Sequence, residues 1–219
     1  MSETLETQPA KAPYPAAGAA PTFVNFQVLR IDPRYHTLLS NEKVVAKQEF
    51  LSCFDTFQRQ MKLAAYGLAG LSASGDLLLW RASPDIGAFN QMTGRLQGAG
   101  LGKYLTPSRS FLGTTVGGEP GTARFLFLQA GPSSSDASGR GLADEVRRQC
   151  ALIPAVRLQV IACAGLDEWG HVFALETEEP REYLRLAALL GELQGGALRK
   201  APAFSCLQKD IRDIVDDLG

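Results

Sequence analysis

The chain has 219 residues, of which 45% are hydrophobic and 21% are charged, and its formal net charge is −1. Lysine and arginine are spread along the chain, so the composition excludes the strongly basic surface that binds nucleic acid or anionic lipid. No apolar run approaches the roughly 20 residues that cross a bilayer, and no apolar segment like that of a signal peptide follows the N-terminus. We expect a cytoplasmic protein with no membrane span and no nucleic-acid partner.

The four cysteines also favour a cytoplasmic location. They lack close pairing and lie within apolar patterns, which is typical of reduced core residues. They are Cys53, Cys150, Cys163 and Cys206. No Cys-x-x-Cys, paired histidines or Gly-x-Ser-x-Gly turn occurs, so thioredoxin, zinc and serine hydrolase sites have no support.

In chain order, residues 1–21 are acidic and then rich in alanine and proline, and we predict a disordered tail. A first half follows over residues 22–116. Its predicted elements are a strand over Phe23–Ile31, a helix from about Asn41 capped by Ser40, strands over Ala64–Leu71 and Leu77–Trp80, a helix opened by Ser83-Pro84, and a strand over Ser108–Thr114. The inner face of the second helix is predicted to be Ile86, Phe89, Thr93 and Leu96. The glycine-rich run from Gly98 to Gly102 follows this helix and is predicted to be a flexible connector.

The second half, residues 121–219, repeats this order. Its predicted elements are a strand over Arg124–Gln129, a mobile loop over Gly131–Arg140, a helix over Leu142–Leu152, strands over Val156–Cys163 and His171–Glu176, a helix from Pro180, a strand over Ala203–Leu207 and a short terminal helix over Asp210–Leu218.

An internal repeat relates the two halves. GLSASGDLLLWRASP and GLDEWGHVFALETEEP begin 95 residues apart. At this offset the matching positions are Gly70 with Gly165, Leu71 with Leu166, Gly75 with Gly170, Pro107 with Pro202 and Leu112 with Leu207. Each half has the strand-helix-strand-strand-helix-strand order of ferredoxin-like folds. We predict an α+β fold in which two such repeats form one eight-stranded barrel, and we expect a homo-oligomer.

Several segments resemble chlorite dismutases and coproheme decarboxylases. FQVLRIDPRYHTLL, LLLWRASPDIGAFNQM and LGKYLTPSRSFLG are similar to the first half of that family, and VRLQVIACAGLDEWGHVFALETEEPREYLRL and KAPAFSCLQKDI are similar to its second half. The resemblance covers about Phe23 to Leu218. It implies a dimeric α+β barrel, assembly into pentamers, and haem or coproheme in the second half. The implied reactions are the splitting of chlorite and the oxidative removal of propionates from coproheme.

The resemblance also places the family's site residues. Its iron-ligating histidine corresponds to Val146, on the apolar stripe of the helix before the VRL strand. The opposite arginine or glutamine corresponds to Gln159, and the redox-active tyrosine corresponds to Gln129. A hydrocarbon cannot donate an electron pair to iron, so we predict a divergent member without histidine-ligated haem. As a strand residue, Gln159 is equally explained by a hydrogen bond to a neighbour.

Three further residues are candidates. His171 alternates with Phe173 along a strand and could ligate a metal or haem from a new direction, or could be a core or edge residue. Cys150 lies one helical turn from Val146 and could supply a thiolate ligand. Trp169, in a turn, could contact a partner or pack against the barrel rim.

Three functional hypotheses follow. The first is a divergent family member that binds a small molecule, a metal or a protein partner, and it has no predicted catalytic residue. The second is a haem- or coproheme-dependent oxidoreductase with a non-standard ligand, Cys150 or His171. The third is a structural oligomer. The sequence leaves the cofactor open.

Overall fold

The computed structural model describes residues 21–116, 119–132 and 138–219, so all of the predicted tail except Pro21 lies outside the described residues. The strands are β1 (Thr22–Ile31), β2 (Lys62–Gly67), β3 (Leu77–Ser83), β4 (Leu105–Thr115), β5 (Phe125–Gly131), β6 (Arg157–Ala162), β7 (His171–Thr177) and β8 (Ala203–Gln208). The helices are α1 (Ser40–Gln58), α2 (Gly87–Gly98), α3 (Ser138–Ala151), α4 (Pro180–Leu190), α5 (Ala197–Lys200) and α6 (Ile211–Asp217).

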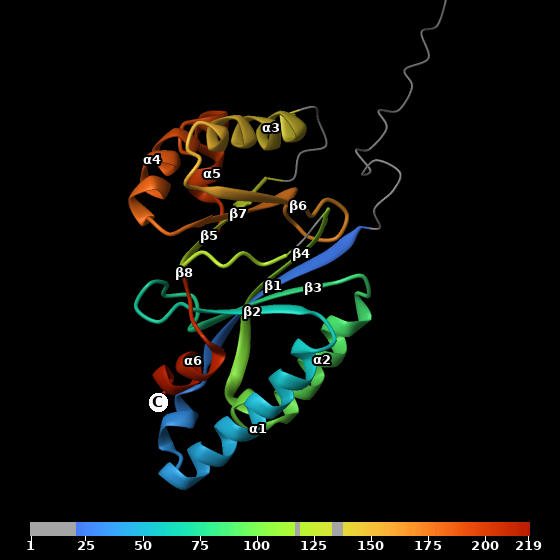
Figure 1. Cartoon of the computed structure of the whole chain (residues 1–219), viewed down its shortest axis with the longest axis vertical. Coiled ribbons are helices and arrows are strands. Elements are labelled where there is room, and N and C mark those ends of the chain that lie inside the picture. The colour runs from blue at the N-terminus through green and yellow to red at the C-terminus, as the bar shows by residue number, and fades with distance from the viewer. Residues whose placement is uncertain (1–20, 117–118, 133–137) are drawn as a thin grey trace, which may run out of the picture.

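The strands form one closed barrel in the order β1-β3-β2-β8-β5-β7-β6-β4. Within each half the first strand pairs with the third and the fourth, which is the ferredoxin-like arrangement. Figure 1 shows α1, α2 and α6 on one side of the barrel and α3, α4 and α5 on the other. The predicted α+β barrel of two ferredoxin-like repeats is confirmed.

The two halves meet along two weakly paired seams. At the first seam, β2 pairs with β8 at only Tyr66↔Gln208 and Gly67↔Leu207. At the second, β4 pairs with β6 in the described residues at only Thr114↔Ala162. Within a half, by contrast, β5 pairs with β7 from Phe125 to Gly131. In the described part of the chain, the barrel is therefore closed by short contacts at both seams.

Three apolar clusters stabilise this arrangement, because alternate residues of each strand face opposite sides of the sheet. The barrel interior contains side chains such as Phe26, Trp80, Phe111 and Ile161. A second cluster lies between the first sheet and α1, α2 and α6, and a third lies between the second sheet and α3 and α4. Trp169 packs against the interior cluster, as its rim interpretation predicts.

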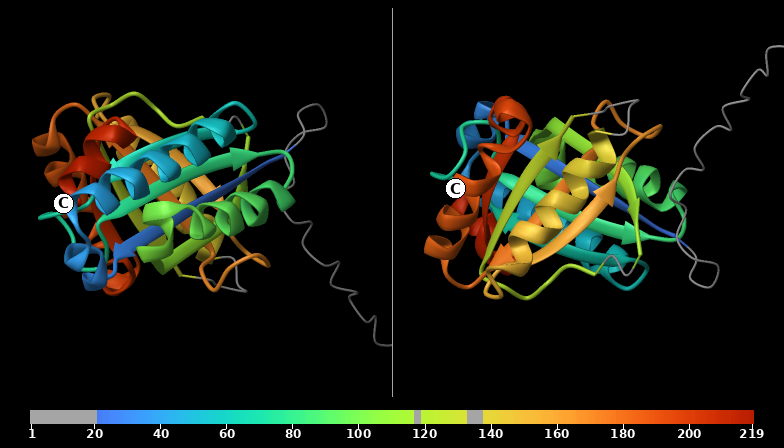
Figure 2. Two further views of the ribbon diagram at one scale, coloured as in Figure 1. Left: turned by 90° about the horizontal axis from the view of Figure 1, so that it is seen from below. Right: turned by 90° about the horizontal axis from the view of Figure 1, so that it is seen from above.

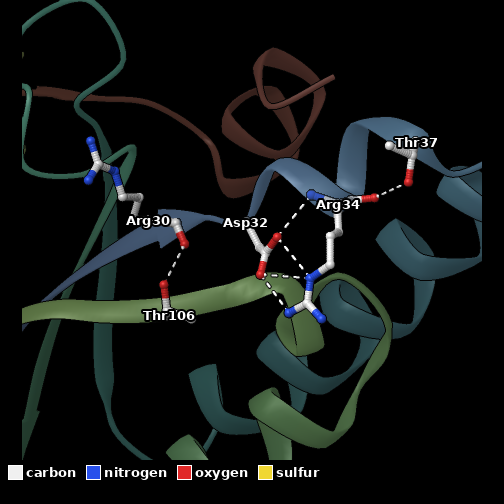
Figure 3. A network of polar contacts seen from close by, with 5 residues as sticks. All are labelled: Arg30, Asp32, Arg34, Thr37 and Thr106. Atoms are coloured by element: carbon white, nitrogen blue, oxygen red, sulfur yellow. Dashed lines mark hydrogen bonds and ion pairs between the residues drawn. The ribbon is translucent and has the colours of Figure 1, made fainter.

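The end of β1 shows how local chemistry ends an element. Asp32 accepts a hydrogen bond from the Arg34 backbone N–H at 2.9 Å and from the Arg34 guanidinium, and Pro33 follows at the first position of a 3₁₀ turn (Figure 3). The Arg34 hydrogen bonds lower the pKa of Asp32 to about 2. The strand therefore ends where the sequence predicts, at Asp32-Pro33.

The repeat holds in the turn glycines but not at a constant offset. Gly70 and Gly165 both adopt positive φ, 75° and 82°, which favours glycine. Gly67 pairs with Leu77, and Ala162 pairs with His171, so the β6–β7 connection is one residue shorter than the β2–β3 connection. Gly75 and Gly170 are thus not equivalent. In the strand ladders, Phe111 lies opposite Phe26 and Phe204 lies opposite Leu128. The later matches of the repeat therefore do not occupy equivalent ladder positions. They are Pro107 with Pro202 and Leu112 with Leu207.

Three helix starts differ from the prediction. The first helix begins at Ser40, so Leu39 and not Ser40 is its N-cap. The second helix begins at Gly87 instead of Pro84, because Ser83 and Asp85 side chains accept hydrogen bonds from backbone N–H groups in the preceding turn. Ile86 is consequently 43% exposed, and Met92 takes its place on the inner face. The third helix begins at Ser138, inside the predicted loop, whose residues 133–137 lie outside the described residues.

The glycine-rich connector is a packed 3₁₀ turn over Gly100–Tyr104, not an open linker. Any Cβ at Gly100 or Gly102 would collide with a helix backbone carbonyl, that of Ala46 or that of Leu96. Glycine is therefore needed there for close approach to α1 and α2, so flexibility does not explain it.

Candidate functional site

Val146, the position that matches the family's iron ligand, is fully buried on α3. It faces the outer side of the second sheet within a cluster of hydrocarbon side chains, and the right-hand view of Figure 2 shows α3 (yellow) between β5 and β6, which flank β7 in the sheet. Leu142 of the same helix and Phe173 of β7 belong to the same cluster and are 1% and 0% exposed. The space between α3 and the sheet is therefore filled.

This environment does not fit a histidine-ligated haem. Haem iron takes an axial nitrogen, sulfur or oxygen donor, and the side chain of Val146 has none. Leu186 and Leu190 of α4 close the same cluster from the other side. Hydrocarbon side chains thus occupy the volume that an axial ligand and a porphyrin would need.

Cys150 does not replace the missing donor. It is 5% exposed, and burial raises the pKa of its thiol to about 11. The ligand in thiolate-bound haem is the deprotonated sulfur, and a thiol with this pKa is protonated near neutral pH. No arginine or lysine is hydrogen-bonded to this thiol in the described structure.

His171 lies on the same side of the sheet as Val146, at the start of β7. Its ring stacks on Phe173 with 6.0 Å between centroids, and its Nδ1 is buried without a hydrogen-bond partner among the described residues. Burial, and then the nearby Arg147, lower the pKa of His171, so the neutral imidazole is favoured. Among the described residues, no three His, Cys, Asp or Glu side chains are grouped so that they could hold a metal ion.

Gln129 also lies on this side, but its amide is used structurally. Its Nε2 donates to the carbonyl oxygen of Leu198 at 3.0 Å and to that of Ala130 at 3.1 Å. These bonds attach α5 to β5. The position that matches the family's tyrosine therefore holds a helix in place.

Gln159 is separated from these residues by the sheet. Leu158 and Val160 pack against the cluster around Val146, whereas Ile161 belongs to the barrel interior. Since side chains alternate along a strand, Gln159 faces the interior side. Its Nε2 donates to the carbonyl oxygen of Glu119, and its Oε1 is buried with no partner among the described residues. The apolar alternation of Leu158 and Val160 was the sequence signal for this placement.

A groove of about 780 Å³ runs between the C-terminal part of α3 and β6. It brings together Cys150 and Gln159, two of the five predicted site residues, but not Val146, Gln129 or His171. Arg147 and Arg157 line it, and no Asp or Glu of the described residues does. The apolar part of its lining includes Val116, Val156 and Leu158. The groove can therefore accept a ligand with an anionic group and an apolar body.

The two arginines are held by carboxylates outside the groove. Arg147 pairs with Asp144 at 2.7 Å, and Arg157 pairs with Glu176 at 3.2 Å. Glu176 is only 1% exposed and accepts a hydrogen bond from the Gly121 N–H at 2.7 Å. Burial raises the pKa of Glu176, although Gly121 and Arg157 oppose the shift. Sequence reasoning missed both arginines and Glu176.

The other seam carries a second groove of about 530 Å³, between β2 and β8. Its cations, among them Lys209 and Arg212, share the lining with Glu178 and Asp210. Arg212 also pairs with Asp55 at 2.8 Å. The mixed charge of this groove gives no preference for an anion, so the groove beside β6 is the better candidate site.

A buried arginine in the first half is a further residue that sequence reasoning missed. Arg81, 2% exposed, donates to Asn25 Oδ1, to Thr93 Oγ1 at 2.8 Å and to the Phe89 carbonyl oxygen at 3.3 Å. No carboxylate of the described residues pairs with it, and burial lowers its pKa to about 10. These hydrogen bonds join β1, β3 and α2, which gives Arg81 a structural role.

Comparison with known proteins supports one family. The family model for chlorite dismutase matches residues 43–120. A mutant chlorite dismutase from Candidatus Nitrospira defluvii is similar in structure, with a TM-score of 0.79 and 17% identity over 92% of this chain and 96% of that chain. The chlorite dismutase of the same organism in complex with imidazole gives 0.77 and 16%, over 90% and 94%.

A heme-binding protein from Thermus thermophilus is also similar, with a TM-score of 0.72 and 13% identity over 92% of this chain and 98% of that chain. Comparison with curated protein sequences gives no match. At these identities the structural similarity establishes the fold. None of the helices in the described part of the chain combines the length and the apolar run that crossing a bilayer requires.

Proposed function

We propose that this chain, which matches the chlorite dismutase family model over residues 43–120 and has the fold of chlorite dismutases, binds a small amphipathic anion in the groove beside β6 instead of a histidine-ligated haem. The observation that carries this proposal is the environment of Val146. A hydrocarbon stands at the ligand position, and packed side chains fill the space around it. The family's reactions depend on an iron centre, so this chain is proposed to use its barrel for binding.

The chemistry of the groove supports an anionic ligand. Arg147 and Arg157, which line the groove, supply positive charge. The apolar walls would take up a hydrocarbon body. A metal ligand has less support, because the described residues contain no group of side chains suited to one.

Arg147 allows a matched binding test. Octanoate, a carboxylate with an apolar chain, is titrated by calorimetry into the wild type, Arg147→Gln and Arg148→Gln. Arg148 follows Arg147 on α3, pairs with Glu145 and does not line the groove. A charged hydrogen bond contributes about 1.5–3 kcal/mol, so we expect Arg147→Gln to weaken binding about 10-fold or more and Arg148→Gln to leave it unchanged. No saturable binding to the wild type, or equal loss in both variants, contradicts the proposal.

A haem test decides between this proposal and an oxidoreductase with a non-standard ligand. The protein is expressed with supplied haem and, separately, with coproheme, and its absorption spectrum is recorded. We expect no stoichiometric Soret band. A stoichiometric band that is lost in Cys150→Ser or His171→Ala would overturn our proposal and establish the alternative.

We also propose that the protein is a cytoplasmic homo-oligomer, as the family resemblance implies. Exposed large apolar side chains support association, because Leu152, directly after α3, is 72% exposed and Leu184 of α4 is 65% exposed. The four cysteines are free, which is consistent with a reducing compartment. Sedimentation equilibrium tests the oligomer against the 23.6 kDa monomer, and a pentamer is the expected assembly.

A further inference from the structure

Glu176 is a carboxylate inside the barrel at a position where the other half has a hydrocarbon. Leu126 of β5 lies opposite Glu176, and at the equivalent place in the first half Val24 of β1 lies opposite Ala82. Ala82 and Glu176 are 2% and 1% exposed. Burying a carboxylate costs free energy that a single ion pair often does not offset, and the first half forms its sheet without one. The packing of the barrel therefore does not require a carboxylate at this position.

Glu176 is fixed in place, whereas its cationic partner reaches the surface. Its Oε1 accepts a hydrogen bond from the Gly121 N–H at 2.7 Å, and a Cβ on Gly121 would lie within 3.0 Å of the carboxylate, so the β4–β5 connection packs directly against it. Arg157 pairs with Oε2 at 3.2 Å, and its side chain is 52% exposed. Arg157 also lines the groove beside β6. A long, half-exposed arginine can turn toward a ligand in that groove, and the carboxylate cannot follow it.

The charge of Glu176 acts mainly on Arg157. Among the described residues, Arg157 is the one cation that pairs with this carboxylate. Tyr66 of β2 also faces it, because burial and then the charge of Glu176 raise the pKa of Tyr66. Burial raises the pKa of Cys206 on β8, so this thiol and the Tyr66 hydroxyl both stay neutral near neutral pH. Two other charged side chains nearby pair with each other, Glu119 and Lys62.

We propose that Glu176 is a positioning residue for the anion site and makes binding there depend on a proton. The ionised carboxylate holds Arg157 against the barrel, and the protonated carboxyl releases the guanidinium to a ligand in the groove. Carboxylate and ligand compete for one cation, so protonation of Glu176 and binding of the anion favour each other. Because burial raises the pKa of Glu176, the carboxyl takes up its proton at a higher pH than an exposed glutamate does. This role of Glu176 rests on the proposed function of the groove.

Octanesulfonate tests this role, because it stays anionic at acidic pH, where octanoate becomes protonated. It is titrated by calorimetry into the full-length wild type and Glu176→Gln, from alkaline to acidic pH. We expect the affinity of the wild type to rise as pH falls. At alkaline pH the competing charge is present only in the wild type, so Glu176→Gln should bind at least about 5-fold more tightly. The two affinities should converge at acidic pH.

Two variants are the controls. Asp144 is the partner of Arg147 and its side chain is 69% exposed, so Asp144→Asn should change the affinity by no more than about 2-fold and keep the pH dependence. His171→Asn removes a second ionisable side chain near Arg147 but retains Glu176, so it should keep the pH dependence even if Glu176→Gln does not fold. Titrations in buffers with different protonation enthalpies measure proton uptake. We expect uptake on binding to the wild type and His171→Asn, and none on binding to Glu176→Gln.

Three results would overturn the role of Glu176. Wild-type affinity that does not change with pH would show that the carboxylate does not compete with the ligand. Weaker binding by Glu176→Gln at alkaline pH would show that the carboxylate holds Arg157 in the binding position instead. A pH dependence that disappears in His171→Asn would assign the proton to the imidazole. In all three cases octanesulfonate still binds the wild type, so the proposed function stands, whereas no saturable binding at any pH would overturn both.

Discussion

Substitution of Val146 tests whether the space next to α3 is packed or open. The side chain is fully buried among hydrocarbons. Val146→Ala removes two methyl groups, worth about 0.8 kcal/mol each in transfer free energy, and leaves a cavity that the neighbours fill only in part. We expect a loss of about 2–3 kcal/mol in the free energy of unfolding. For a chain of this size, that loss lowers Tm by about 5–10 °C.

The opposite substitution makes the test decisive. Val146→Leu adds a methylene group to a filled space, so we expect it to cost about 1–3 kcal/mol as well. Leu152→Ala, directly after the end of α3, is the control, because Leu152 is 72% exposed and its loss should change stability by no more than about 0.5 kcal/mol. Thermal unfolding followed by circular dichroism measures all three. If Val146→Leu stabilises the protein and Val146→Ala costs little, the space is open and the argument against haem fails.

Three further predictions concern other parts of the barrel. A Cβ on Gly121 would lie within 3.0 Å of the Glu176 carboxylate, so Gly121→Ala should lower Tm. The control is Gly94→Ala, whose Cβ meets nothing within 4 Å and which should raise the stability of α2 by about 0.5–1 kcal/mol. Equal effects of the two variants in thermal unfolding would contradict the packing around Gly121. The pKa of Glu176 is raised in the folded state, so its contribution to stability is present at low pH and is lost as pH rises through that pKa. The Tm of the wild type should therefore fall relative to that of Glu176→Gln as pH rises from acidic values, and a constant difference would show that the pKa of the carboxyl is not raised. Iodoacetamide should modify the half-buried Cys53 first, while burial protects Cys150 and the other two thiols; mass spectrometry of the folded protein checks the order, and early modification of Cys150 would show that the groove exposes it.

The sequence by itself determined the elements and the barrel. The continuous apolar run from Val172 to Leu175 is typical of a strand that is buried on both faces, and the helical spacing of Phe50, Phe54 and Phe57 is typical of a helix that buries one face. The structure has both. The turn at Gly70 and its repeat at Gly165 need positive φ, so glycine marks them in the sequence. The family resemblance also identified Val146 as a hydrocarbon at a ligand position. These features depend on residues close together in the chain.

Only the tertiary structure decided how the candidate residues lie relative to one another. It separated Gln159 from Val146 by the thickness of the sheet and brought Arg147 and Arg157 together in the groove beside β6. The physical reason is that alternation along a strand determines which side of the sheet each side chain faces. It does not determine which strand lies beside which edge. That depends on barrel closure, which brings together residues about fifty positions apart, such as Thr114 with Ala162 and Gly121 with Glu176. No local pattern encodes such contacts.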